Sequence, residues 1–189
     1  MKLVVTGGAG FIGHHFVPAA LALGHDVTVV DNLHRGSFER PQLVGARLVV
    51  ADIRDTEAVS EALAGRECVI HLAAQSNVMG SQADPDYTMT TNVDGTWNVA
   101  RCAARAGVPH VVFASSREVY GEAQRLPVDE AHSISPCNLY GASKAAGEHL
   151  LRAMPSGGPR ISILRLANVI GSGDSGRVLP TWLEQARRG

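Results

Sequence analysis

Short runs of apolar, mostly β-branched residues alternate along the chain with longer stretches rich in alanine and leucine. The short runs are apolar at nearly every position, which is typical of parallel strands that helices cover on both faces. The pattern predicts strands at Leu3–Thr6, Val27–Asp31, Leu48–Ala51, Cys68–Leu72, His110–Ala114 and Ile161–Leu166.

The longer stretches have helical character and predict helices at Phe11–Leu23, Thr56–Ala64, Tyr87–Ala106 and Leu139–Met154. Asp55 stands at the N-cap of the second, and Gly24, Gly65 and Gly107 stand where helix C-terminal glycines usually fall. The alternation predicts an α/β fold of the Rossmann type, a doubly wound parallel sheet with helices on both faces.

A glycine-rich segment follows the first predicted strand and opens the first predicted helix, with Gly7, Gly10 and Gly13 three residues apart. Such a segment turns tightly, lets the backbone approach a diphosphate, and places it at a helix N-terminus, whose free N–H groups attract anions. The spacing alone is weak evidence in a chain with 20 glycines. Its place between strand and helix predicts a dinucleotide site, and the alternative is a glycine-rich turn without a ligand.

Asp31 ends the second predicted strand, 21 residues after Gly10. A carboxylate there accepts both hydroxyls of an adenosine ribose and repels a 2′-phosphate, which favours NAD over NADP. Arg35 keeps NADP open as an alternative. Asp52 and Ile53 follow the third predicted strand, where Asp52 could reach the adenine edge or equally be an acid at the start of a helix.

Tyr140 and Lys144 lie one helical turn apart on the same predicted face. A phenol has a pKa near 10, and lowering it by about 3 units takes roughly 4 kcal/mol of extra stabilisation, which a neighbouring ammonium and a bound cofactor supply. Only two of the 17 basic residues, Lys2 and Lys144, are lysine, so this pairing is unexpected by chance. Tyr140 is predicted to act as a base while hydride leaves for the cofactor; a surface Tyr/Lys pair is the alternative.

Two serines, Ser115 and Ser116, follow the fifth predicted strand at the edge of the sheet where α/β proteins bind ligands. A hydroxyl there could hold the substrate oxygen beside Tyr140, although a serine at a strand end is often a helix cap.

Composition excludes several functions. With 45% hydrophobic residues and a net charge of −1, the chain is predicted to be a globular protein that binds neither nucleic acid nor a membrane. Cys68, Cys102 and Cys137 are too far apart in sequence to suggest a zinc site or a disulfide framework, so no metal site is predicted. The N-terminus lacks a signal-peptide pattern, and a cytoplasmic location is expected.

Together, these segments resemble the extended short-chain dehydrogenase/reductase family, in its NAD-dependent nucleotide-sugar epimerase/dehydratase branch. The matching segments are Gly7–Gly13, Val30–Leu33, Asp52-Ile53, His71–Ser76, Asn92–Thr96, Ser115–Gly121, Tyr140–Lys144 and Arg165–Gly171, in family order.

The resemblance implies an NAD site, a set of catalytic residues and contacts to a nucleotide-sugar substrate. The implied NAD-binding residues are Gly7, Gly10, Phe11, Ile12, Gly13, Asp31, Asn32, Leu33, Asp52, Ile53, Leu72, Ala73, Ala74, Asn92, Ser115, Tyr140 and Lys144. The implied catalytic residues are Ser116, Tyr140 and Lys144, joined by Glu118, and the implied substrate contacts are Ser76, Ser116 and Asn168.

The family oxidises a sugar hydroxyl to a ketone, performs a second step and returns the hydride. Its dehydratases carry an Asp-Glu pair after the strand-end hydroxyl, and here those positions are Arg117 and Glu118. Since epimerisation needs only that the keto-sugar accept hydride on its other face, 4-epimerisation is the first hypothesis. Glu118 keeps a dehydratase or decarboxylase as the second.

The resemblance also predicts how the chain is divided. Residues 1–170 are expected to form the NAD-binding domain, and residues 171–189 to begin a substrate-binding region that family members continue further. The chain is therefore expected to be a fragment or a naturally short protein, and an NAD-binding module without turnover is an alternative function. A homodimer through the helices at Tyr87–Ala106 and Leu139–Met154 is also expected by analogy, although their apolar faces could equally belong to the core.

Overall fold

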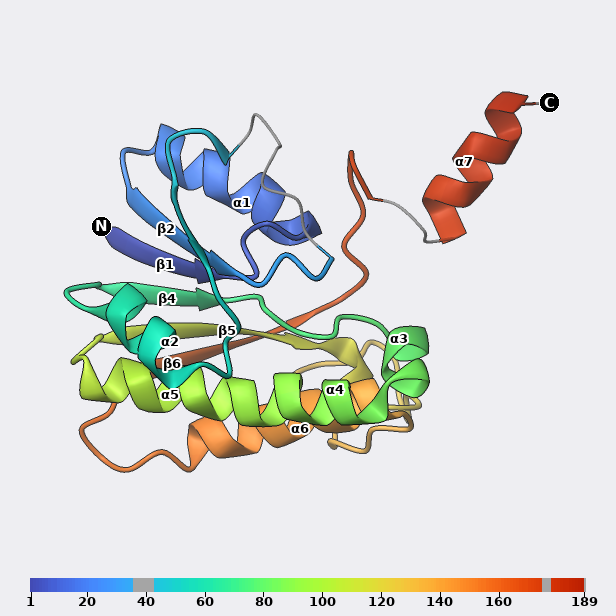
Figure 1. Cartoon of the computed structure of the whole chain (residues 1–189). Helices are drawn as coiled ribbons and strands as arrows, with labels where there is room; N and C mark the ends of the chain where they lie inside the picture. The colour runs from blue at the N-terminus through green and yellow to red at the C-terminus, as the bar shows by residue number, and fades with distance from the viewer. Residues whose placement is uncertain (36–42, 175–177, 189) are drawn as a thin grey trace.

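Six parallel strands form one sheet in the computed structural model, which describes residues 1–35, 43–174 and 178–188 (Figure 1). The strand order is β3-β2-β1-β4-β5-β6, and every neighbouring pair is parallel. The strands are β1 (Lys2–Thr6), β2 (Asp26–Asp31), β3 (Arg47–Val50), β4 (Cys68–His71), β5 (His110–Ser116) and β6 (Arg160–Leu166). The predicted Rossmann-type sheet is confirmed, with strand ends that differ by at most two residues.

Three of the predicted helices are confirmed, and the fourth is divided into three consecutive segments. The confirmed helices are α1 (Phe11–Ala22), α2 (Thr56–Leu63) and α6 (Leu139–Arg152). The long helix expected at Tyr87–Ala106 consists of α4 (Pro85–Met89), a π-helical segment (Thr90–Gly95) and α5 (Thr96–Arg105). The sequence analysis missed α3 (Val78–Ala83) and a 3-10 turn at Arg117–Val119. The last helix, α7 (Val178–Arg188), lies in the segment that was expected to begin the substrate-binding region.

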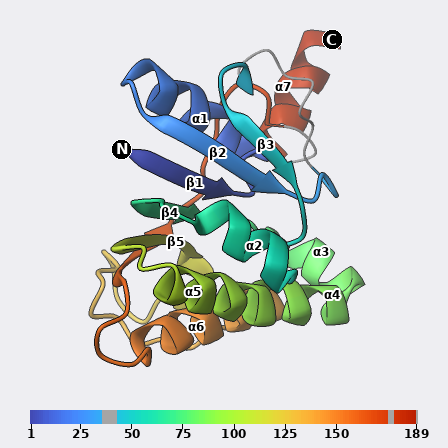
Figure 2. The same ribbon diagram turned by 60° about the vertical axis from the view of Figure 1, so that its left-hand side comes forward.

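Helices cover the sheet on both faces, as strands that are apolar at nearly every position require (Figures 1 and 2). Leu3 and Val5 of β1 belong to a buried cluster with residues of α1. Val4, between them, faces the opposite side and belongs to a cluster with residues of α2 and α5. One strand thus contributes to two cores.

Local capping follows the predictions. The side chain of Asp55 accepts hydrogen bonds from the backbone N–H groups of Glu57 and Ala58 at the start of α2. Gly24 and Gly107 end α1 and α5 with φ angles of 77° and 68°, a conformation that glycine adopts without strain.

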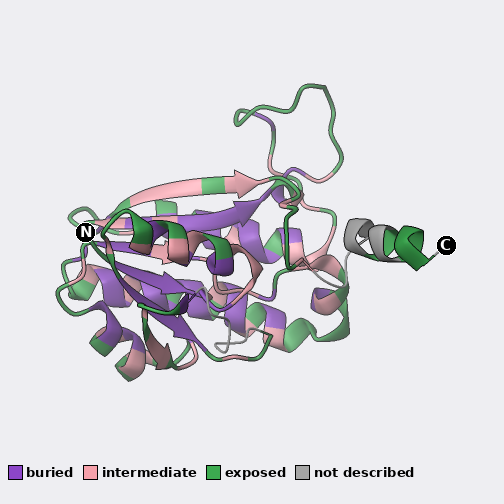
Figure 3. Ribbon diagram, turned by 90° about the horizontal axis from the view of Figure 1, so that it is seen from above, coloured by how far each residue is buried: buried purple, intermediate pink, exposed green. Residues whose placement is uncertain are grey.

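Figures 1 and 3 show α7 apart from the sheet and its helical layers, beyond the carboxyl ends of the strands. Before it, the chain passes near α1, where the ring of His15 lies 2.8 Å from the carbonyl oxygen of Ser172. Within the described ranges, every helix is too short or too polar to cross a membrane. The boundary expected near residue 170 stays a prediction.

Candidate cofactor and active site

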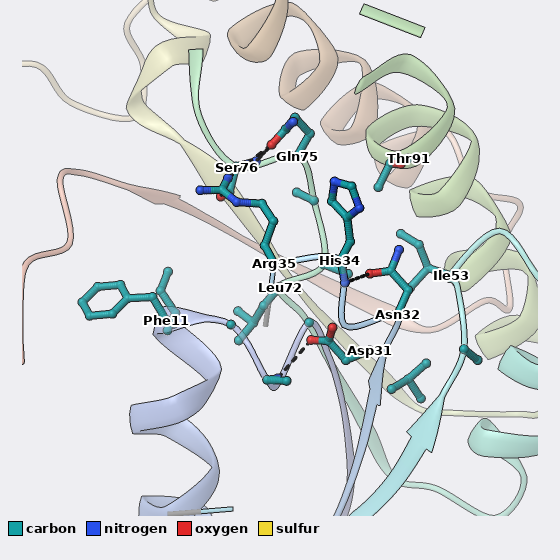
Figure 4. A pocket seen from close by; sticks show the side chains of 18 of the residues that line it. Phe11, Asp31, Asn32, His34, Arg35, Ile53, Leu72, Gln75, Ser76 and Thr91 are labelled. Carbon is teal, nitrogen blue, oxygen red and sulfur yellow. Dashed lines mark hydrogen bonds between the residues drawn. The ribbon is translucent and has the colours of Figure 1, made fainter. Parts of the chain in front are cut away.

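A cleft opens where the carboxyl ends of β1, β2 and β4 meet (Figure 4). The chain leaves β1 toward β2 on one side and later adds β4 on the other, so the cleft lies at the switch point of the topology, where α/β proteins bind ligands. Many of the predicted NAD-binding residues line it, together with the predicted substrate contact Ser76. These lining residues are Gly7, Gly10, Phe11, Ile12, Asp31, Asn32, Ile53, Leu72, Ala73 and Ala74.

The glycine loop has the geometry that the sequence predicted for it. Gly7 has a φ of +70°, and a Cβ at this position would lie 2.6 Å from the backbone nitrogen of Ala73. A Cβ on Gly13 would collide with the backbone of Gly8. The loop therefore packs tightly against the segment that follows β4 and against its own turn, and it presents the first turn of α1 to the cleft. The N–H groups of a first helical turn have no partner within the helix, and for this reason helix N-termini commonly bind anions.

The carboxylate of Asp31 is held between this loop and the end of β2. It is buried, and its Oδ2 accepts a hydrogen bond from the backbone N–H of Ala9 at 3.0 Å. Its Oδ1 accepts one from the backbone N–H of Leu33 at 2.8 Å. Each carboxylate oxygen keeps a further lone pair for a ligand hydroxyl, because an ionised carboxylate offers about four acceptor positions.

Asp52 is paired with Arg54. Its two oxygens accept hydrogen bonds from Nε and Nη2 of Arg54, each at 2.8 Å, and Oδ2 also accepts one from Nδ2 of Asn32 at 3.0 Å. The hydrogen bond from Arg54 is the largest cause that lowers the pKa of Asp52 to about 2. Asp55 is the acid that caps the helix, whereas Asp52 fixes Asn32 at the edge of the cleft.

Tyr140 and Lys144 lie in the first turns of α6, which Asn138 caps by accepting a hydrogen bond from the N–H of Gly141 at 2.8 Å. Lys144 is only 3% exposed, and its Nζ donates to the backbone oxygen of Ala114 in β5 at 2.9 Å. Burial lowers the pKa of Lys144 to about 8. The ammonium is therefore fixed at the carboxyl end of β5 and still carries a proton at neutral pH.

Ser116 and Glu118 lie in the segment that follows β5. The hydroxyl of Ser116 accepts a hydrogen bond from the N–H of Glu118 at 3.2 Å. Glu118 accepts one from Nδ2 of Asn138 at 2.8 Å through Oε2, and its Oε1 pairs with Arg117 at 2.9 Å. The carboxylate of Glu118 thus has two partners within the protein.

The remaining predicted residues have structural partners. Asn92 is buried and donates to the hydroxyl of Ser143 at 2.9 Å, which ties the π-helical segment to α6. Ser115 donates to Glu148 at 2.6 Å, and Asn168 accepts a hydrogen bond from Arg117 at 3.3 Å.

Some predicted residues lie outside the cleft lining that the structure describes: Gly13, Leu33, Asp52, Asn92, Ser115, Ser116, Glu118, Tyr140, Lys144 and Asn168. The cleft therefore corresponds to the glycine-loop part of the predicted site. That the other residues contact cofactor or substrate stays a prediction.

Sequence reasoning missed Tyr87, which lines the cleft. Its ring lies 4.9 Å from that of His34, and the guanidinium of Arg54 lies 5.2 Å from its centre. Nothing near Tyr87 in the sequence shows that its helix passes the end of β2. Gln75 belongs to the matching segment His71–Ser76, for which the sequence predicted no role at this position, and it also lines the cleft.

Comparisons with known proteins agree with this geometry. The sequence model of the "NAD dependent epimerase/dehydratase family" matches residues 3–189. A putative UDP-glucose 4-epimerase of Methanocaldococcus jannaschii is 42% identical over 175 residues, which cover 89% of this chain and 56% of that protein.

Among solved structures, a UDP-glucose 4-epimerase of Thermus thermophilus in complex with NAD is 38% identical, with a TM-score of 0.81 over 87% of this chain and 54% of that one. A dTDP-glucose 4,6-dehydratase of Streptomyces venezuelae with NAD bound is 34% identical, with a TM-score of 0.92 over 100% of this chain and 63% of that one. This chain spans about half the length of the curated relatives it matches. By sequence and by structure, the chain belongs to the NAD-dependent epimerase/dehydratase family.

Proposed function

We propose that the chain binds NAD in the cleft and forms the cofactor-binding part of a nucleotide-sugar 4-epimerase. The observation that carries the proposal is the pairing of two features at one edge of the sheet. One is the glycine loop with the buried carboxylate of Asp31, and the other is α6, which places Tyr140 one turn from the buried ammonium of Lys144. The tight fit of Gly7 against Ala73 supports a backbone cradle for a diphosphate.

When bound, NAD takes up a hydride from the sugar carbon and returns it. The chain's own residues do the rest of the proposed chemistry. The first-turn N–H groups of α1 bind the diphosphate, and Asp31 accepts the adenosine ribose hydroxyls. Tyr140 removes the proton of the sugar hydroxyl, and the positive charge of Lys144 favours the phenolate that this step requires. Ser116 is proposed to hold the same sugar oxygen.

Epimerisation is favoured over dehydration by the state of Glu118. A dehydratase needs a carboxyl group that is free to move a proton to or from the sugar. Here the carboxylate of Glu118 binds Asn138, the cap of α6, and pairs with Arg117. These contacts support a positioning role for Glu118 in holding α6 against the end of β5.

The proposal is tested by incubating the purified chain with NAD and UDP-glucose, then UDP-galactose and dTDP-glucose, and separating the products by chromatography. NADH binding, read by its fluorescence, is the expected result for this cofactor-binding part. Interconversion of the 4-epimers by the chain would establish the activity directly, and Tyr140→Phe should then abolish it while NADH still binds. A 4-keto-6-deoxy product would establish the dehydratase alternative instead. NADH binding without any conversion would support the alternative of a cofactor-binding module.

We also propose that two copies pair through the outer faces of α5 and α6. The support is Trp97 on α5, a large apolar side chain that is 37% exposed. Sedimentation of the wild type as a dimer, and of Trp97→Glu as a monomer, is the expected result; a wild-type monomer would contradict it.

A further inference from the structure

One arginine reaches across the cleft from the segment after β2 to the segment after β4 (Figure 4). Nη1 of Arg35 donates to Oε1 of Gln75 at 3.3 Å and to the hydroxyl of Ser76 at 3.4 Å. In the sheet, β1 lies between β2 and β4. The side chain of Arg35 therefore crosses the carboxyl end of β1, where the glycine loop begins.

The charge around the cleft makes this position notable. Among the described residues that line the cleft, Arg35 is the only lysine or arginine, whereas Asp31 and Asp174 are acids. The diphosphate of a dinucleotide carries two negative charges, and the N–H groups of α1 supply only partial positive charge. A full positive charge on the open side of the glycine loop would complement them.

The two hydrogen bonds that Arg35 makes in the structure are weak enough to be replaced by bonds to a ligand. Both acceptors are neutral, and both distances exceed the usual 2.7–3.2 Å range of an N–H···O hydrogen bond. Arg35 is exposed, so the guanidinium can move without unpacking a core. A phosphate oxygen offers shorter, charge-assisted bonds to the planar fork of a guanidinium.

We infer that Arg35 is a cofactor-binding residue whose guanidinium contacts the dinucleotide diphosphate from the side opposite α1. This inference rests on the proposed function, because it takes NAD as the occupant of the cleft. It also assigns Arg35 a role other than binding a 2′-phosphate. The guanidinium contacts Gln75 and Ser76 on the β4 side of the cleft. The 2′-phosphate of NADP would lie beside Asp31, the proposed ribose-binding residue, and Asp31 accepts its hydrogen bonds from Ala9 and Leu33.

The test compares adenosine, ADP-ribose, NADH and NADPH as ligands of the wild type, Arg35→Gln and Arg35→Lys. Arg105→Gln is the matched control, because it removes the same charge from an exposed position at the end of α5. In Arg35→Gln we expect binding of ADP-ribose and NADH to weaken about tenfold or more, which is the scale of one charge-assisted contact. Adenosine binding stays within about twofold, Arg35→Lys recovers part of the loss, and the control matches the wild type.

Three results would overturn the inference while leaving NAD binding intact: unchanged ADP-ribose binding in Arg35→Gln, an equal loss for adenosine and ADP-ribose, or a larger loss for NADPH than for NADH. The last would make Arg35 a 2′-phosphate ligand. Failure of the proposed function looks different, since the wild-type chain would then bind neither NADH nor ADP-ribose.

Discussion

A buried ion pair behind the proposed active site gives a prediction whose size follows from the structure. Glu148 lies one turn after Lys144 on α6 and is fully buried. It accepts hydrogen bonds from Nε and Nη2 of Arg165 at 2.9 and 2.8 Å and from the hydroxyl of Ser115 at 2.6 Å. Arg152, 3.2 Å away, is a second ionic partner with a half-exposed side chain. The network joins α6 to β5 and β6.

Replacing Arg165 by Met removes two of these hydrogen bonds and leaves a buried carboxylate with Ser115 and the more distant Arg152. Breaking a buried pair from one side costs about 3–5 kcal/mol of unfolding free energy. The matched control is Arg152→Met, which removes the same charge from the surface side and should cost at most about 1 kcal/mol. Urea denaturation of both variants at neutral pH measures the difference.

The pH dependence tests the same reasoning independently. Burial raises the pKa of Glu148, but hydrogen bonds from Arg165 and Ser115 outweigh this effect and hold it below its usual value of 4.5. In the wild type, the stability from Glu148 is therefore fully present above about pH 4.5 and is lost as the pH falls through the lower folded-state pKa.

In Arg165→Met the folded-state pKa rises instead, because burial now dominates. The stability penalty of the variant should therefore be largest near neutral pH and shrink as the pH falls and the carboxyl group takes up a proton. A penalty below 1 kcal/mol at neutral pH, or one that does not change with pH, would refute the claim of a buried, charged carboxylate that depends on Arg165.

Three further predictions concern the cofactor site. Lys144→Met should raise the unfolding free energy at pH 7 by about 3 kcal/mol, because burial lowers the pKa of Lys144 from 10.5 to about 8 and so penalises its charged form. This gain should disappear as the pH rises from about 8 to 10.5. An equal gain at pH 7 and at about pH 10.5 in urea denaturation would contradict this reasoning. Gly7→Ala should cost about 1–3 kcal/mol more than Gly24→Ala in thermal unfolding, since both have a positive φ but only the Cβ on Gly7 would meet a backbone; equal costs would argue against the tight cradle. Asp31→Asn should reduce the preference for NADH over NADPH about tenfold, because the repulsion of a 2′-phosphate is lost; an unchanged ratio of dissociation constants would remove Asp31 from the ribose site.

Much of the fold could be predicted from the sequence because its signals are local. The apolar strands identify a doubly covered parallel sheet, and the glycine loop and Asp55 mark the starts of α1 and α2. The exceptions have physical reasons. The helix α3 is only six residues long and depends on a cap by Asn77, and the π-helical segment ends at Gly95, whose missing side chain makes room for Ile53.

The cofactor part of the candidate site could be predicted where one segment carries the signal, as at Gly7 and Asp31. Partners that come from distant segments could not. Nothing local indicates that Ser115 binds Glu148 or that Glu118 binds the cap of α6. The contact of Tyr87 with Asn32, at 3.3 Å, joins residues 55 positions apart and appears only after folding.

The most direct test of the account is a titration of the isotopically labelled chain with NAD, followed through the chemical shifts of its backbone amides. The account predicts saturable changes concentrated in Gly7–Gly13 and Asp31–Leu33. Saturable changes that cluster elsewhere, or none at all, would contradict the claim that the glycine-lined cleft holds the dinucleotide.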